Sequence, residues 1–146
     1  VGGSISNFIC ENSAIGNSMF RKSDWEKVGG YDESMKQGFE DWEFYIRLLS
    51  SEGIAYVIPE VLFNYRIRKN STSTRANEIK YDLRRYILNK HQNLYNQHHI
   101  IYADYLFKLI EREEFEKLKN LKRLEYRIGH SLLRPLRWLK RFFSFG

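Results

Sequence analysis

Cysteine is nearly absent from this 146-residue sequence, and long apolar runs are absent altogether. The one cysteine, Cys10, excludes an internal disulfide and a zinc site built from several thiolates, which is typical of a reducing compartment. No stretch approaches the ~18 consecutive apolar residues of a membrane-spanning helix. The sequence shows no signal peptide and does not begin with Met, so we expect a piece of a longer protein or a processed chain.

Positive charge is concentrated near the end of the sequence. The chain has a formal net charge of +6, with 42% hydrophobic and 29% charged residues, a composition typical of globular proteins. Residues 117–146 contain nine basic residues and one acidic residue, so this segment is +8 and residues 1–116 sum to −2. A cationic segment of this kind binds phosphates, either in anionic lipid or in nucleic acid.

Two short helices are predicted in the first third of the sequence. Ser23 and Glu26 have the spacing of a capping box, in which each side chain bonds the backbone N–H of the other residue. Gly29 would end this helix early. A second helix is predicted over residues 40–52, because its apolar residues recur at i, i+3, i+4 and i+7.

The sequence pattern changes near residue 73. Before that point, short strands are predicted over residues 17–21, 55–58 and 61–67, the last of them with alternating apolar and polar residues. After it, apolar residues recur almost throughout at helical spacing. We therefore predict an α/β region over residues 1–72, followed by a helical extension over residues 73–146.

Two adjacent carboxylates, Glu40 and Asp41, begin the second predicted helix. Acidic residues in a first turn offset the positive end of the helix dipole, by roughly 0.3–1 kcal/mol each. A general base also requires a carboxylate held at the end of a rigid element, near an aromatic ring such as Trp42 that can hold a substrate. The residues alone leave both interpretations open.

Five short motifs, in order along the chain, resemble the C-terminal half of the catalytic domain of family 2 glycosyltransferases, which has the GT-A fold. They are residues 18–22 (SMFRK), 25–33 (WEKVGGYDE), 38–44 (GFEDWEF), 59–66 (PEVLFNYR) and 70–73 (NSTS). Each motif is weak by itself, and their order makes the resemblance specific. It implies an α/β, GT-A nucleotide-diphospho-sugar transferase fold, of which residues 1–72 would be the acceptor-side part.

The resemblance assigns catalysis to the two carboxylates. Asp41 would be the general base that deprotonates an acceptor hydroxyl, whose oxygen then attacks the anomeric carbon of a nucleotide-sugar with inversion. Glu40 would shape the acceptor site. The acceptor would be a saccharide or a lipid-linked saccharide, in the synthesis of a cell-envelope polysaccharide on the cytoplasmic side of a membrane.

Substrate binding is assigned to residues that follow the carboxylates. Arg66 and Arg68 would stabilise the departing diphosphate, although an exposed arginine on an edge strand is an alternative for Arg66. Trp42 would lie against the substrate. Asn70 and Ser71 would belong to the loop that closes over the nucleotide.

The part of the family that binds the nucleotide has no counterpart in this sequence. There is no D-x-D motif, which in the family holds Mg²⁺ or Mn²⁺, and no G-x-G-x-x-G motif or P-loop. The histidines, among them His91, His98 and His99, lack the i, i+4 spacing of a helical zinc site. We therefore predict no metal site in this chain, and we expect the isolated chain not to transfer sugar.

The last segment, residues 131–146, predicts a partner. Its leucines and its arginines form two separate stripes of a helix, the composition of a helix that lies on a membrane. We predict peripheral binding to the anionic inner face of the cell membrane, with packing onto the chain's own domain as the alternative. Nucleic acid is disfavoured because no recognition module is evident.

Two further hypotheses stay open at this level. The first is that the chain is a non-catalytic, basic helical module that docks on a membrane or on nucleic acid. The second concerns assembly: a partial sheet with an exposed edge invites pairing with another copy of the chain.

Overall fold

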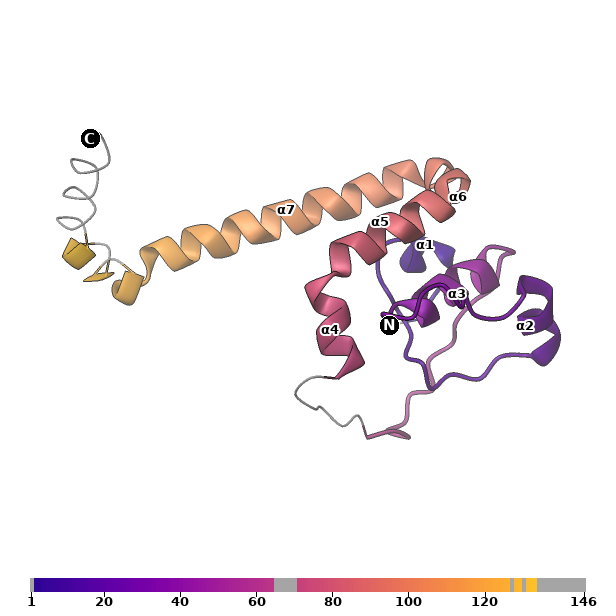
Figure 1. The fold of residues 1–146 in the computed structure, drawn as a ribbon. Helices are drawn as coiled ribbons and strands as arrows, with labels where there is room; N and C mark the ends of the chain where they lie inside the picture. Colours follow the sequence, from indigo (N-terminus) through magenta and orange to yellow (C-terminus); the bar gives the residue numbers. More distant parts are fainter. Residues whose placement is uncertain (1, 65–70, 127, 130, 134–146) are drawn as a thin grey trace, which may run out of the picture. The chain divides into compact units, whose positions relative to one another are not determined.

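The computed structural model describes residues 2–64, 71–126, 128–129 and 131–133 (Figure 1). The chain forms two compact units, Val1–Ala103 and Asp104–Gly146. Its helices are α1 (Ile5–Phe8), α2 (Lys22–Val28), α3 (Glu40–Leu49), α4 (Thr72–Glu78), α5 (Lys80–Lys90), α6 (Gln92–Gln97) and α7 (His99–Lys122).

Helix α3 is the centre of the first unit. Helices α1 and α2 pack against it (Figure 1), and α5 contacts it through Arg84, whose guanidinium lies 5.0 Å from the centre of the Trp42 ring. Most of its side chains are buried, namely Trp42, Glu43, Phe44, Tyr45, Ile46 and Leu49. Because α3 is enclosed in this way, the position of its first turn is fixed by packing.

Aromatic contacts bring three of the sequence motifs together around α3. The ring of Phe44 lies 5.0 Å from that of Phe20 and 4.6 Å from that of Tyr31, between ring centres. Aromatic pairs of this kind contribute about 0.5–1.5 kcal/mol each beyond the area they bury. Motifs that are separate in the sequence therefore form one region of the folded chain.

The predicted strands do not form in the residues that the structure describes. Residues 17–21 and 56–64 have no regular structure, and residues 65–67 lie outside the described residues. The one β-bridge found among the described residues joins Gly3 to Ala55, with N···O distances of 2.9 and 2.8 Å. A strand is stable only when a neighbour supplies partners for its backbone. The predicted GT-A fold stays a prediction.

Two predicted helix ends are wrong. Helix α2 begins at Lys22 with Arg21 as its N-cap, so Ser23 and Glu26 lie inside the helix and form no capping box. Its predicted end at Gly29 is confirmed, since that residue is left-handed, with φ 75°. Helix α3 ends at Leu49 instead of residue 52: the backbone N–H and the hydroxyl of Ser50 both bond the Arg47 carbonyl, and Glu52 is left-handed, with φ 62°.

The chain after the predicted boundary is helical in α4–α7, and the division into an α/β region and a helical extension stays a prediction. The first compact unit nevertheless continues to Ala103, beyond the boundary predicted at residues 72–73. Helix α4 lies against the turn before α3, so closely that a Cβ added to Gly38 would stand 2.6 Å from the Cβ of Ala76. The start of α3 is therefore held by a helix from the other side of the predicted boundary.

Replacing Gly38 with Ala is expected to destabilise the protein by roughly 2–5 kcal/mol, the sum of backbone strain and overpacking. Gly38 has a φ of 123°, which L side chains rarely adopt, and no room for a Cβ. Urea unfolding measures the change. The matched control is Gly29→Ala, with φ 75° in open space, for which about 1–2 kcal/mol is expected. Equal losses in the two variants would contradict the proposed clash with Ala76.

Candidate active site

The turn that leads into α3 has a strained backbone. Phe39, its N-cap, is left-handed, with φ 64° and ψ 10°, a conformation that costs a non-glycine residue on the order of 1–3 kcal/mol. The Phe39 ring packs edge-on against Trp42, with 5.5 Å between ring centres, and its carbonyl accepts the backbone N–H of Glu43 at 3.0 Å. These contacts hold the turn, and the turn sets the direction of the two residues that follow.

The carboxylate of Asp41 is fixed by two hydrogen bonds. Its Oδ1 accepts from Asn12 Nδ2 at 3.2 Å and from the backbone N–H of Trp42 at 2.7 Å. Its Oδ2 lies beside Gly16, where an added Cβ would stand 3.9 Å away. Asp41 is half-buried. One oxygen is thus anchored, while the other faces a residue that has no side chain.

Two tyrosines and Glu40 complete the surroundings of Asp41. Burial raises the pKa of the Tyr31 hydroxyl, and the negative charges of Asp41 and Glu40 raise it further. Burial also raises the pKa of Tyr45, against a hydrogen bond with Ser18 and with the charge of Asp41 as a smaller cause. The Tyr45 hydroxyl donates to the Ile15 carbonyl at 2.8 Å. The segment 12–18 is therefore tied to α3 at the carboxylate of Asp41 and, one turn later, at Tyr45.

Trp42 lies in the core. Its side chain is 2% exposed, its Nε1 donates to the carbonyl of Phe8, and its ring is covered by Phe39 and Arg84. In this structure the ring presents no open face to a sugar. Its contacts give Trp42 a packing role, and its predicted contact with a substrate stays a prediction.

The predicted nucleotide-side residues are mostly outside the described part of the chain. Arg66, Arg68 and Asn70 belong to residues 65–70, which the structure does not describe. Ser71 is the N-cap of α4, and its Oγ accepts from the backbone N–H of Thr74 at 3.2 Å. Ser71 thus has a structural function, and the predicted contacts of all four residues with a nucleotide stay predictions.

A second cluster, the Glu43 network, was not predicted from the sequence. Glu43 is fully buried, and its carboxylate contacts Arg47 at 2.7 Å, Lys90 at 2.9 Å and His91 at 2.8 Å. Lys90 also bonds Asp32, in the GGYDE motif. Burial raises the pKa of Glu43, but the hydrogen bonds from His91, Arg47 and Lys90 outweigh it and lower that pKa to about 2.

Asp32 connects this network to the loop before α3. Hydrogen bonds from Lys90, then from Ser34 and Tyr86, hold the pKa of Asp32 well below its usual range. Arg47 extends the network in the other direction, because its guanidinium donates to the Val28 carbonyl at the end of α2. The network therefore joins α2, α3, α5 and the loop that carries the GGYDE motif.

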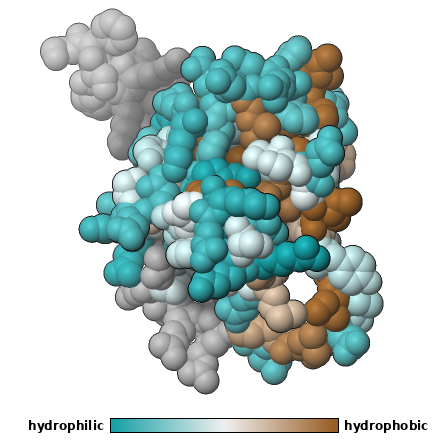
Figure 2. Space-filling model, turned by 90° about the vertical axis from the view of Figure 1, so that its right-hand side faces the viewer, coloured by the Kyte–Doolittle hydropathy of each residue, from teal (hydrophilic) through white to brown (hydrophobic). Residues whose placement is uncertain are grey.

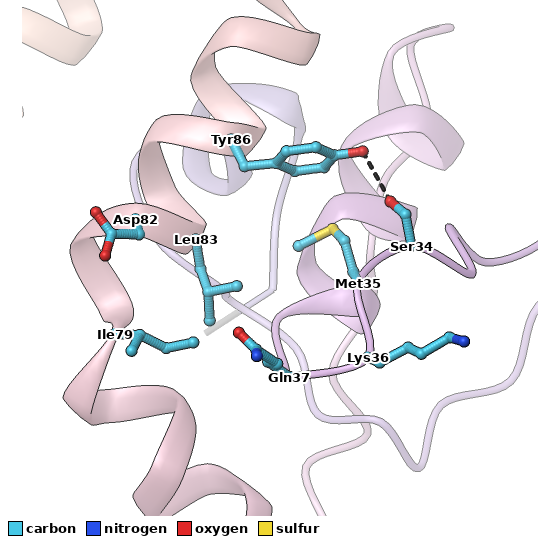
Figure 3. A pocket seen from close by; sticks show the side chains of 8 residues that line it. All are labelled: Ser34, Met35, Lys36, Gln37, Ile79, Asp82, Leu83 and Tyr86. Carbon is cyan, nitrogen blue, oxygen red and sulfur yellow. Dashed lines mark hydrogen bonds between the residues drawn. The ribbon is translucent and has the colours of Figure 1, made fainter.

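A pocket of about 250 Å³ lies next to this network, between the 34–37 loop and α5 (Figure 3). Its lining residues are Ser34, Met35, Lys36, Gln37, Ile79, Asp82, Leu83 and Tyr86. Figure 3 shows the Tyr86 hydroxyl reaching across to that of Ser34, 3.0 Å away. Neither Glu40 nor Asp41 lines it, so this pocket is separate from the candidate site at the start of α3.

The described residues do not fit a metal ion. Within them, no three His, Cys, Asp or Glu side chains come close enough together to ligate one. The Mg²⁺ or Mn²⁺ expected from the resemblance has no site in this part of the chain, and we derive no step through it.

Across the described residues, no helix combines the length and apolar content needed to span a bilayer.

Comparison with known families gives one match, to a model described as glycosyltransferase-like family 2. It covers residues 2–109 and so includes the start of α3 and the Glu43 network. Comparisons with curated proteins and with solved structures found no match.

Proposed function

The chain belongs to glycosyltransferase-like family 2, and we infer from this that Asp41 is the general base of a sugar transfer. The observation that carries the proposal is the anchored carboxylate of Asp41, with one oxygen bonded to Asn12 and to the Trp42 backbone. A base must be held in one direction to take a proton efficiently. Family membership supports glycosyl transfer in general, and the particular reaction is our proposal.

The proposed reaction is a single displacement. Asp41 takes the proton from a hydroxyl of a saccharide or a lipid-linked acceptor. The hydroxyl oxygen forms a bond to the anomeric carbon of a nucleotide-sugar, while the bond from that carbon to the diphosphate breaks. Attack from the side opposite the diphosphate inverts the anomeric carbon. Glu40, beside Asp41, would shape the acceptor site, and Arg66 and Arg68 would stabilise the charge that develops on the diphosphate.

We propose that a second, nucleotide-binding half covers the segment 54–63. The predicted strands 55–58 and 61–67 overlap this segment, and its large apolar side chains are exposed: Ile54, Tyr56, Val57, Ile58, Val61, Leu62 and Phe63. Figure 2 shows hydrophobic and hydrophilic surface side by side on the face that it draws. Contiguous exposed apolar surface is typical of an interaction site. A neighbouring strand from the donor half would bury these side chains and pair their backbone.

The isolated chain is expected to transfer no sugar, because its sequence has the proposed base but no D-x-D motif, G-x-G-x-x-G motif or P-loop. The assay supplies the purified chain with a panel of nucleotide-sugars and an acceptor pool, and follows release of nucleoside diphosphate. The positive control is the chain joined to a nucleotide-binding half from the same family, in which release should appear. Transfer by the isolated chain would contradict the proposed division into halves, and no release from the joined protein would contradict the function.

Residues 131–146 are proposed to bind the anionic inner face of a membrane, which would bring the site to lipid-linked acceptors. The proposal rests on the sequence pattern, since residues 134–146 lie outside the described part of the chain. Each basic residue near an anionic leaflet contributes about 1 kcal/mol. Deleting residues 131–146 should therefore abolish cosedimentation with vesicles that contain phosphatidylserine. Unchanged cosedimentation would show that this segment is not the membrane contact.

A further inference from the structure

Helix α7 carries an unusual stripe of residues along one side. Phe107, Ile110, Glu114, Lys117 and Leu121 follow one another at spacings of three, four, three and four. This alternation is the a and d pattern of a coiled coil, which keeps all five residues on one face. We call this set the α7 stripe. It lies wholly within the second compact unit, Asp104–Gly146.

The apolar members of the α7 stripe are exposed to solvent. Phe107 is 65% exposed, Ile110 53% and Leu121 39%, and the neighbouring Leu118 is 57% exposed. A shallow groove lies at its centre, lined by Leu109, Ile110, Glu113, Glu114 and Lys117. An apolar helix face of this kind is stable when another helix covers it. The charges within the stripe indicate which helix that is.

The α7 stripe is complementary to a second copy of itself that runs in the opposite direction. When two identical helices pair antiparallel, an a residue of one faces a d residue of the other. With the twofold axis midway between Glu114 and Lys117, Glu114 faces Lys117 of the second copy, and the reverse contact also forms. In the same register, Ile110 faces Leu121 of the second copy. The two Glu114–Lys117 pairs, which we call the ionic layers, then have an Ile110–Leu121 pair on their outer sides.

A parallel pair of the same helices has the opposite electrostatics. Glu114 would face Glu114, and Lys117 would face Lys117, so two adjacent layers would each hold like charges. Like charges opposed across an interface disfavour that arrangement strongly. Polar residues at a and d positions are known to select register and orientation at some cost in affinity. The two charged residues thus select one partner orientation out of two.

We propose that the α7 stripe is a homodimer interface, in which two copies of this chain pair antiparallel through Phe107, Ile110, Glu114, Lys117 and Leu121. Glu114 and Lys117 take part in no ion pair with each other or with other described residues, so both charges are available for the second copy. In this register the stripe residues that face one another run from 110 to 121, a span of about 17 Å at 1.5 Å per residue, and Phe107 faces Leu124, just beyond the end of α7. An interface of this size is small, and the dimer is expected to be weak and concentration-dependent.

Charge reversal tests the interface in the full chain. Glu114→Lys and Lys117→Glu each place like charges in both ionic layers, and each should raise the dimer Kd by at least about tenfold. The double variant, Glu114→Lys with Lys117→Glu, restores opposite charges and should return the Kd to near the original value. Light scattering coupled to gel filtration, over a range of concentrations, measures the dimer. Circular dichroism confirms that every variant keeps its helix content.

Three results would overturn the proposal: a chain that stays monomeric at all concentrations, single variants that dimerise as the original does, or a double variant that does not recover. Disulfide trapping tests orientation independently. Oxidation of a mixture of Ile110→Cys and Leu121→Cys chains should give a mixed disulfide, whereas Ile110→Cys alone should give none. The original chain, in which Cys10 is the one cysteine and is buried, measures the background of crosslinking. A crosslink in Ile110→Cys alone would mean parallel pairing and would also reject the proposed interface.

Discussion

Replacing Asp41 with Asn is expected to lower the turnover of the enzyme that contains this chain by about 10²–10⁴-fold, the usual contribution of a general base. An asparagine keeps the shape of the side chain. Its Oδ1 can still accept from Asn12 and from the Trp42 backbone, as Asp41 does now. The variant therefore removes the proton acceptor and leaves the local geometry in place. The measurement is kcat for release of nucleoside diphosphate, with KM expected to change little.

The same variant separates the two interpretations of the carboxylate. If Asp41 only offset the helix dipole, its neutralisation would cost about 0.3–1 kcal/mol of stability and would not change turnover specifically. The matched control is Asp104→Asn, an exposed carboxylate that pairs with Lys108 in α7, which should leave kcat unchanged. Full turnover in Asp41→Asn would remove Asp41 as the base. A large loss of stability would instead mark it as structural.

The helix that carries the candidate site could be predicted from the sequence, but the partner that anchors its carboxylate could not. The apolar spacing of residues 42–49 is a local pattern, and the structure confirms a helix there. Asn12 lies 29 residues before Asp41, in a stretch with no periodicity. Nothing in the spacing of the residues indicates a contact of this kind, because the fold alone brings the two segments together.

The strands were predicted because alternation is also a local pattern, but a strand has no stability without a neighbour. Residues 61–64 have the alternation, and the described residues supply no second strand beside them.

The short helix α1 was missed because it has no local pattern that sequence reasoning could use. Its four residues, Ile5–Phe8, are too few to show a helical period, and Phe8 is held in place by burial against α3.

The apolar spacing that predicts the second helix does not indicate that Glu43 is buried, and the structure places it fully buried. Charged residues are almost never buried unless they are paired. Its partners are one helical turn away, at Arg47, and 47 and 48 residues away, at Lys90 and His91. Only the i, i+4 pairing with Arg47 could have been noticed from spacing. The distant partners depend on how α5 packs against α3.

Replacing Glu43 with Gln is expected to destabilise the protein by about 3–5 kcal/mol, the usual cost of removing one partner from a buried ion pair. The neutral side chain keeps the volume but no longer compensates the charges of Arg47 and Lys90, and Lys90 retains only Asp32 as an ionic partner. The loss is a large fraction of the roughly 5–15 kcal/mol that stabilises a typical domain. Urea unfolding at neutral pH measures it. The control is Glu116→Gln, whose partner Lys119 is exposed, and a change of less than about 1 kcal/mol is expected there.

The pH dependence gives this prediction a second, independent test. The pKa of Glu43 falls from 4.5 to about 2 on folding, so the folded state binds this proton less tightly than the unfolded state. Its stabilisation is complete above about pH 4.5 and is lost as the pH falls towards 2. Stability of the original chain should therefore fall steeply in that range. In Glu43→Gln the fall should be shallower but still present, because the pKa of Asp32 is also lowered. Equal slopes in the two proteins would mean that the carboxylate is not paired as the structure shows.

Because Glu43 lies two residues after Asp41 on α3, a loosened Glu43 network should also reduce turnover in the assay used for Asp41→Asn.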